Sequence, residues 1–346
     1  MVRSTHMVLA SALLLVASAC GFLDMIGLES RSSRVERLLS SLAADSMAGR
    51  AIGSLGSAMA ARLIASEFDD AGVEPAGTSG YVQDIAVTRV TPPDGASRVV
   101  LAQDAEMFPE SSKELISDRN LIGIVRGSDP TVADEVIVVG AHFDHVGIGR
   151  SVNGDSIYNG ADDDASGVVA VLEAARDLAR RPSRRSVVFV LFTGEEVGGL
   201  GSRWYLDNPA VPLEQTVAQL QVEMIGRPDS LAGGPGRVWA TGYERSNVGQ
   251  ILSAQGIQVV ADPYPDQNFF FRSDNVRFAY EGIPAHTLSS FNQHTDYHAP
   301  SDEVGSIDLD HIVLAIETII MAVRALADAP DAPSWNEGGW PERIAR

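Results

Sequence analysis

Residues 136–192 carry three consecutive patterns, which are VIVVGA at 136–141, an amphipathic run over 168–178 and VVFVLF at 187–192. The first and last patterns are continuously apolar, as is typical of strands buried on both faces. In the middle run the apolar residues recur at helical spacing, at Val168, Val171, Leu172, Ala175 and Leu178. A strand, a helix and a second strand in this order predict a βαβ unit and therefore an α/β fold.

Further patterns extend this unit in both directions. Apolar spacing predicts helices around 35–42 and 60–68, and Gly72 is a plausible stop for the second helix. The segment from 94 to 114 gives only a weak signal. Short apolar runs predict additional strands at 81–90, 120–125, 216–224 and 238–241.

A long apolar helix is expected over 309–326. Glu317 and Arg324 interrupt it at depths where charge is costly in a bilayer, which favours a helix packed on the sheet over a membrane span. We predict a single α/β domain over residues 32–329, with a mixed, mostly parallel central sheet flanked by helices. Residues 330–346 are rich in Pro, Gly and charge, so we interpret them as a C-terminal tail.

The composition limits the function classes. The 346 residues include 46 Asp and Glu against 26 Lys and Arg, a formal net charge of −20. This balance argues against a nucleic-acid partner, because binding to phosphates needs clustered cations. Hydrophobic residues make up 45% of the chain, which is enough for a core and excludes the disordered class. The single cysteine allows neither an internal disulfide nor a Cys-ligated zinc finger.

The N-terminal segment has the layout of an export signal. Basic Arg3 precedes an apolar run at 8–16, and small residues at 17–19 lead directly into Cys20. This arrangement resembles the bacterial lipobox, which implies a signal peptide over 1–19, a lipid on Cys20 and a tether over 20–31. The protein would then face the periplasm or the cell exterior and touch the membrane only through its anchor. An ordinary signal peptide beside an incidental thiol, or an uncleaved anchor, are the alternatives.

Acidic and histidine side chains gather where the predicted strands end, which is where α/β sheets collect functional groups. His142 and Asp144 follow the first strand, Glu195 and Glu196 follow the second, and Glu223 ends a later one. Taken singly, a surface His beside an Asp or a solvated Glu pair would be the more common explanation. Adjacent Glu residues leaving a strand point to opposite sides, so one can bind a metal while the other acts as a general base.

Three consecutive aspartates, 162–164, come immediately before the predicted helix at 168–178. A solvated helix N-terminus would also favour acids. The flanking glycines and the apolar helix favour a buried turn instead, where the repulsion between carboxylates calls for a cation. A last cluster contains His294 and His298. Imidazole and carboxylate groups without cysteine suit zinc or a related divalent ion in a hydrolytic site.

Five motifs resemble, in order and spacing, those of the di-zinc aminopeptidase family, which includes secreted bacterial aminopeptidases and relatives of glutamate carboxypeptidase. They are GAHFDH at 140–145, NGADDDASG at 159–167, TGEEVGGLGS at 193–202, VEMIGR at 222–227 and DYHAPSD at 296–302. The similarity extends upstream to DSMAGR at 45–50 and GVEPAG at 72–77, and so covers roughly residues 40–328. Five motifs in one order are far more specific than any single short motif.

The resemblance implies two Zn²⁺ ions per chain, a zinc exopeptidase-like fold and a set of site residues. One ion would be held by His142, Asp163 and Glu223, and the other by Asp163, Glu196 and His298, so that Asp163 is shared. Glu195 would be the general base, and Asp144 would orient His142. The resemblance also implies a cis peptide between Asp163 and Asp164.

Two positions depart from the family's commonest pattern. Glu223 stands where many relatives have Asp, and Asn275 stands where His is frequent. Neither change removes an implied ligand. Phe269, Phe270 and Phe271 are compatible with a substrate pocket or with the core, and Arg272 or Arg277 with a substrate carboxylate or a structural acid.

The expected function is a metal-dependent exopeptidase, an aminopeptidase that hydrolyses N-terminal residues from peptides with a water bridging two zinc ions. A carboxypeptidase or a glutaminyl-cyclase-like acyl transferase on the same fold is an alternative, as is a non-catalytic binding lipoprotein. The presence of Glu223 with the Glu195-Glu196 pair favours hydrolysis over the one-metal cyclases. A non-catalytic protein would be expected to have lost ligands, and none of the implied ligands is missing.

Overall fold

The computed structural model describes residues 29–93 and 95–342, and the expected signal peptide and Cys20 lie outside them. The predicted βαβ unit is present as β5 (Val136–His142), α4 (Gly167–Arg180) and β8 (Ser186–Phe192). Strands β5 and β8 pair in parallel, and every residue of both strands is buried. Burial on both faces accounts for their continuous apolar sequence.

These strands lie at the centre of a ten-stranded mixed sheet with the order β11-β10-β12-β9-β5-β8-β4-β2-β3, and β1 pairs with β4. The central strands β12, β9, β5 and β8 are mutually parallel. The remaining strands are β1 (Glu74–Pro75), β2 (Val82–Thr91), β3 (Arg98–Leu101), β4 (Ser112–Val125), β9 (Thr216–Glu223), β10 (Val238–Ala240), β11 (Val259–Ala261) and β12 (Ala285–Ser289). A separate hairpin consists of β6 (Gly147–Val152) and β7 (Asp155–Tyr158).

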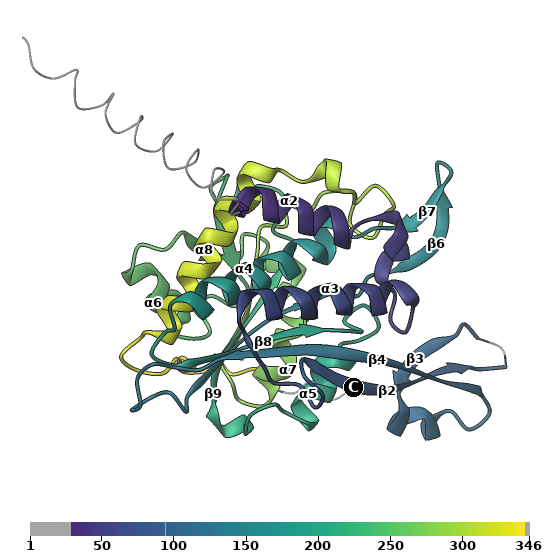
Figure 1. Ribbon diagram of the computed structural model, residues 1–346, viewed down its shortest axis with the longest axis horizontal. Coiled ribbons are helices and arrows are strands. Elements are labelled where there is room, and N and C mark those ends of the chain that lie inside the picture. Colours follow the sequence, from purple (N-terminus) through teal and green to yellow (C-terminus); the bar gives the residue numbers. More distant parts are fainter. Residues whose placement is uncertain (1–28, 94, 343–346) are drawn as a thin grey trace, which may run out of the picture.

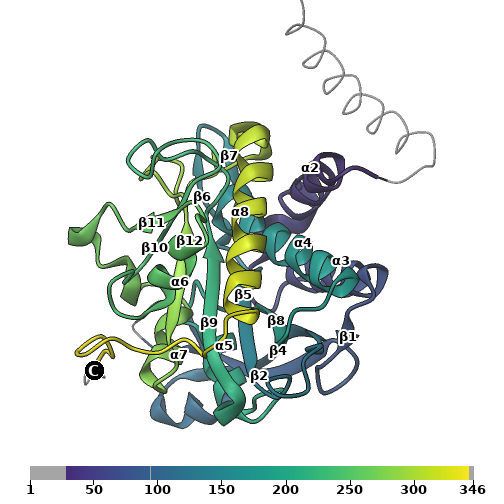
Figure 2. The ribbon, with the colours of Figure 1, turned by 90° about the vertical axis from the view of Figure 1, so that its left-hand side faces the viewer.

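Helices cover both faces of the sheet (Figures 1 and 2). One face is covered by α2 (Arg31–Leu42), α3 (Leu55–Ala71), α4 and α8 (Leu309–Ala327), and the other by α5 (Leu200–Asp207) and α7 (Asn275–Tyr280). A further helix, α6 (Val248–Ala254), lies against α8 and β11.

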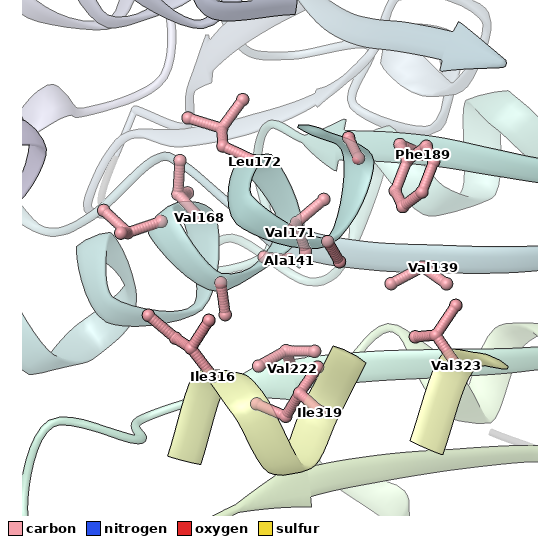
Figure 3. Close-up of a cluster of buried hydrophobic side chains, with 14 of the residues drawn as sticks. Val139, Ala141, Val168, Val171, Leu172, Phe189, Val222, Ile316, Ile319 and Val323 are labelled. Carbon is pink, nitrogen blue, oxygen red and sulfur yellow. The ribbon is translucent and has the colours of Figure 1, made fainter. Parts of the chain in front are cut away.

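Successive residues of β5 belong to the two different cores. Val139 packs in the large cluster under α4 and α8, whereas Val138 packs in the smaller one with Tyr205 of α5 and Phe278 of α7. This alternation follows from the two-residue period of a strand. Figure 3 shows part of the large core, including Val139, Ala141, Val168, Val171, Leu172, Phe189, Val222, Ile316, Ile319 and Val323.

The α8 helix packs against α4 and β5. This confirms the prediction, made from Glu317 and Arg324, that it is a helix of the domain. Among the described helices, none combines the length and the apolar character that a bilayer crossing needs. The stretch that we set apart as a tail is described as far as residue 342, and this part lies against the domain. Its Trp335 indole donates a hydrogen bond to the carbonyl oxygen of Gly282 at 2.8 Å, and Ser246 forms a β-bridge with Trp335.

Candidate metal centre

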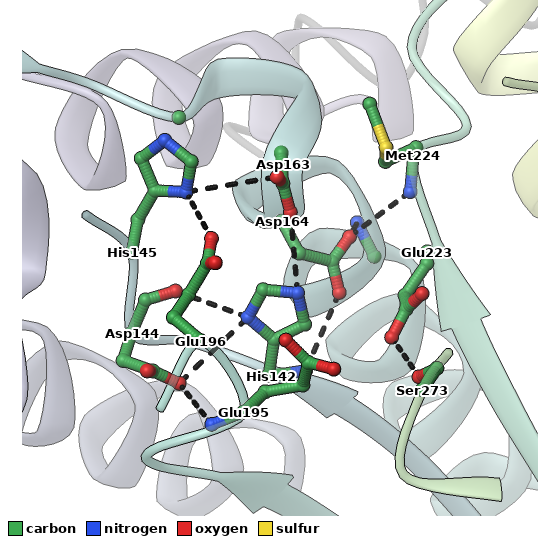
Figure 4. A network of polar contacts seen from close by, with 12 residues as sticks. His142, Asp144, His145, Asp163, Asp164, Glu195, Glu196, Glu223, Met224 and Ser273 are labelled. Atoms are coloured by element: carbon green, nitrogen blue, oxygen red, sulfur yellow. Dashed lines mark hydrogen bonds and ion pairs between the residues drawn. The ribbon is translucent and has the colours of Figure 1, made fainter. Parts of the chain in front are cut away.

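The predicted site residues meet at the carboxyl ends of the central strands (Figure 4). His142 and Glu223 are the last residues of β5 and β9, while Glu195 and Glu196 lie just beyond the end of β8. Asp163 lies in the short turn that leads into α4. Parallel strands end at one edge of the sheet, which explains why segments distant in sequence converge here.

Asp163 lies between two imidazoles. Its Oδ1 is 3.2 Å from Nε2 of His142, and its Oδ2 is 3.2 Å from Nε2 of His298. Burial alone would raise the pKa of Asp163, but its close contacts with these imidazoles hold the pKa well below the usual range. The peptide bond between Asp163 and Asp164 is cis, in agreement with the resemblance. The two distances show that each carboxylate oxygen faces a different histidine, which is what a ligand shared by two ions would require.

The two neighbouring aspartates are occupied elsewhere. Asp162 accepts hydrogen bonds from the Gly226 backbone N–H at 2.7 Å and contacts Nε2 of His294 at 2.9 Å. The Asp164 carboxylate accepts from the backbone N–H groups of Gly167 at 2.9 Å, Met224 at 3.1 Å and His142 at 3.3 Å. These two side chains tie the turn to the strand ends and leave Asp163 to face the site.

Glu196 also lies between two imidazoles. Its Oε2 is 3.0 Å from Nε2 of His298, and its Oε1 is 2.8 Å from Nδ1 of His145. Burial would raise the pKa of Glu196, but its contacts with these histidines leave the pKa below its ordinary value. His145 is absent from the predicted ligand set. Its place in the GAHFDH motif, directly after Asp144, is the one signal that could have identified it.

Glu223 lines the same pocket as His142 and Asp163. Burial raises the pKa of Glu223 to about 7, although the Ser273 hydroxyl donates a hydrogen bond to its Oε1. Asn275, the second departure from the family pattern, has no contact with the predicted ligands among those that the structure describes. Its Nδ2 donates to the Phe270 carbonyl oxygen, and its Oδ1 accepts from Thr287.

Glu195 and Asp144 stand where the resemblance expects a base and an orienting residue. Burial raises the pKa of Glu195 well above its ordinary value, and the nearby carboxylate of Glu223 adds to this shift. The Nδ1 of His142 is 3.0 Å from the Asp144 backbone carbonyl oxygen and 3.7 Å from its carboxylate Oδ1. That carboxylate oxygen instead accepts the backbone N–H of Glu195 at 3.1 Å. Asp144 thus links His142 to Glu195.

An aromatic wall completes the pocket. It consists of Trp239, Phe269, Phe291 and Tyr297, and the Trp239 and Phe269 rings stack at 5.5 Å. Within the Phe run only Phe269 lines this pocket, while Phe270 belongs to the smaller core. No pocket role was predicted for Trp239, Phe291 and Tyr297, although Tyr297 lies within the DYHAPSD motif.

The two arginines that the sequence left open have different surroundings. The Arg272 guanidinium lies over the Phe269 ring, 4.9 Å from its centroid, and lines the pocket. Arg277 instead donates a hydrogen bond to the Gly198 carbonyl oxygen at 2.8 Å.

A buried arginine holds together the two loops that carry the predicted ligands His142 and Asp163. Arg50, from the upstream DSMAGR motif, is fully buried. Its guanidinium donates to the carbonyl oxygens of Phe143 at 2.8 Å, Asn159 at 2.6 Å and Gly160 at 2.9 Å. Phe143 follows His142, and residues 159 and 160 precede the aspartates, so Arg50 fixes one loop relative to the other.

The donor set fits a divalent metal ion. His145 Nδ1, Asp163 Oδ2 and Glu196 Oε1 are buried and have no hydrogen-bond partner within the described part of the chain. Buried polar atoms are rarely left without partners, and a cation bound among these three atoms would satisfy them. Imidazole nitrogen and carboxylate oxygen are the ligands that zinc binds in hydrolytic sites.

Comparison with known proteins shows what this chain is similar to. Residues 120–323 match the family described as peptidase family M28. A probable leucine aminopeptidase 2 of Aspergillus oryzae is 24% identical over 311 residues, which cover 78% of this chain and 59% of that protein. Aminopeptidase YwaD of Bacillus subtilis is 26% identical over 225 residues, or 60% of this chain and 44% of that protein. The chain thus spans about half the length of these curated relatives.

Solved structures confirm the predicted fold. The zinc aminopeptidase BSAP from Bacillus subtilis superposes with a TM-score of 0.62 at 16% identity, covering 87% of this chain and 96% of that one. An aminopeptidase from Aneurinibacillus sp. strain AM-1 gives a TM-score of 0.61 at 17% identity, covering 88% and 98%. Both share the α/β architecture with its mixed central sheet.

Proposed function

Because this chain belongs to peptidase family M28, we propose that it is a zinc-dependent aminopeptidase that removes N-terminal residues from peptides. The observation that carries the proposal is the position of Asp163, whose two oxygens face His142 and His298 at 3.2 Å each. The names of the curated relatives, which are aminopeptidases, support the choice of reaction.

We propose two zinc ions per chain. His142, Asp163 and Glu223 would hold one ion, and Asp163, Glu196 and His298 would hold the other. Zinc bound in this way supplies Lewis acidity and lowers the pKa of water.

Glu195 is the proposed general base. Because burial raises its pKa well above the ordinary value, Glu195 can accept a proton from the attacking water and keep it until the amine departs. The backbone N–H of Glu195 is held by Asp144, which also contacts His142. The base and one of the proposed ligands are therefore positioned by the same residue.

The aromatic wall defines the proposed place of the substrate side chain. Trp239, Phe269 and Phe291 line the same pocket as the acidic residues, and such an aromatic surface favours an apolar N-terminal residue. The free α-amine would then lie near the carboxylates of the centre, which favour a cation.

A free α-amine is accordingly expected to be essential. A peptide with an apolar first residue should be cleaved from its N-terminus, and the same peptide acetylated at the N-terminus should not be cleaved, as measured by mass spectrometry of the products. The zinc-free protein is the control for contaminating peptidases. Equal cleavage of both peptides would indicate an endopeptidase, and release from the C-terminus would indicate a carboxypeptidase.

We also propose that the protein is exported and anchored through a lipid on Cys20, on the basis of its N-terminal sequence alone. Intact-mass analysis of the membrane fraction should show a mature chain that begins at Cys20 and carries the added mass of acyl chains. A Cys20→Ser variant should lack this mass. A wild-type chain without lipid, starting at another residue, would contradict the anchor and leave the peptidase proposal intact.

A further inference from the structure

We propose that His145 is an additional protein ligand at this centre, which joins Asp163, Glu196 and His298 around one zinc ion. The inference deepens the proposed function, since it requires that the centre hold zinc. It assigns a direct role to a residue that lies outside the ligand set implied by the sequence motifs.

The position of the His145 ring carries the inference. Its Nδ1 is 2.8 Å from Glu196 Oε1 and 3.8 Å from Asp163 Oδ2, and the side chain is fully buried. His145, Asp163, Glu196 and His298 each offer one ligand atom, and these atoms all lie within 4.8 Å of one another. His145 thus faces the same small space as the proposed ligands.

The contact between His145 and Glu196 lacks the geometry of a hydrogen bond. Although the two atoms are 2.8 Å apart, neither His145 Nδ1 nor Glu196 Oε1 has a hydrogen-bond partner among the residues that the structure describes. The same holds for Asp163 Oδ2. Leaving buried polar atoms unpaired is costly. One cation placed among them would satisfy all of these atoms, whereas a proton shared by His145 and Glu196 would leave Asp163 Oδ2 unpaired.

The surrounding backbone holds the ring in place. A Cβ atom added at Gly160 would lie only 2.6 Å from Cγ and Cδ2 of His145, so the ring packs directly against this glycine. Arg50 binds the Gly160 carbonyl oxygen at 2.9 Å and the Phe143 carbonyl oxygen at 2.8 Å. The segments on both sides of the ring are therefore fixed, and Nδ1 is positioned before any metal binds.

A fourth ligand on one side makes the centre asymmetric. Four protein ligands close a zinc site, whereas catalytic zinc keeps a position open. The pocket is lined by His142, Glu195 and Glu223, and of the four residues proposed around the other ion only Asp163 and His298 line it. The position at His142 is therefore the more open of the two to substrate.

X-ray absorption at the zinc edge tests the assignment, because it counts imidazoles per zinc. The full chain loaded with two zinc ions should show three imidazoles shared by two ions. His145→Asn should show one fewer and should bind one of its zinc ions at least about 100-fold more weakly, since even the loss of an outer partner costs 10–100-fold. Competition with a chelator measures this affinity.

His286→Asn is the matched control. His286 is equally buried, but it bonds Ser246 and the Thr241 carbonyl oxygen, away from the proposed ligands. This variant should keep the imidazole count and both zinc affinities of the wild type.

Two imidazoles in the wild-type protein, or an unchanged count and affinity in His145→Asn, would overturn the role of His145 while leaving the two-zinc peptidase intact. Failure of the wild-type chain to bind zinc at all would overturn both proposals. The wild-type count decides the question even where the variant does not fold.

Discussion

Replacing Glu195 by glutamine is expected to slow peptide hydrolysis by about 10²–10⁴-fold while both zinc ions stay bound. The side chain lines the pocket beside His142 and Glu223 but is not among the proposed ligands. Glutamine keeps the size of the side chain and removes its ability to accept a proton. Steady-state kinetics gives the loss in kcat, and elemental analysis after dialysis gives the zinc content.

The neighbouring residue provides the contrast. Glu196 contacts His298 at 3.0 Å and His145 at 2.8 Å, so Glu196→Ala should lose zinc together with activity. The two adjacent variants thus separate proton transfer from metal binding. Near-normal kcat in Glu195→Gln would mean that another group is the base.

Strands β5, β8 and β9 of the central sheet could be predicted because they are apolar and buried on both faces, whereas β12, with the sequence AHTLS, was buried but not predicted. VIVVGA and VVFVLF can be read as strands without knowledge of their neighbours, and both are present as β5 and β8. Gly72 is likewise found as the left-handed C-cap of α3, with a φ of 74°. In each case a local physical requirement selects the residue type: burial on both faces selects apolar residues, and a positive φ selects glycine.

The outer part of the sheet was harder to predict, because its strands are partly exposed and therefore lack a continuous apolar sequence. Only the end of β4, from 120 to 125, was predicted, whereas the strand begins at Ser112. Its first half is mostly exposed and includes Lys113 and Glu114, so it lacks an apolar pattern. The β6–β7 hairpin is also largely exposed and was not predicted.

The candidate site shows a similar division. Residues at the ends of buried strands could be named from the sequence, because such ends converge in every α/β sheet. The aromatic wall could not, since Trp239 and Phe291 belong to segments whose proximity depends on the pairing of β10 with β12. His145 was missed because its 2.8 Å distance from Glu196 follows from the fold, and its place after Asp144 in the GAHFDH motif is the one signal that the sequence holds.

Asp163→Asn is expected to deplete both zinc ions and abolish activity. The Asp163 carboxylate is the group that faces both His142 and His298, at 3.2 Å on either side. An asparagine side chain presents one oxygen and one NH2 group, so it cannot offer an oxygen to each ion. Elemental analysis after dialysis, with kinetics on the same sample, measures the effect.

Asp162→Asn is the matched control, because it makes the same chemical change one residue away. Asp162 is bound by Gly226 at 2.7 Å and by His294 at 2.9 Å, so its loss should weaken the turn but leave at least one zinc ion tightly bound. Melting temperatures of both variants would separate unfolding from loss of ligand. If Asp162→Asn lost both ions and Asp163→Asn kept them, the shared ligand would have to be Asp162. That result would conflict with the hydrogen bonds that hold the Asp162 carboxylate away from both imidazoles.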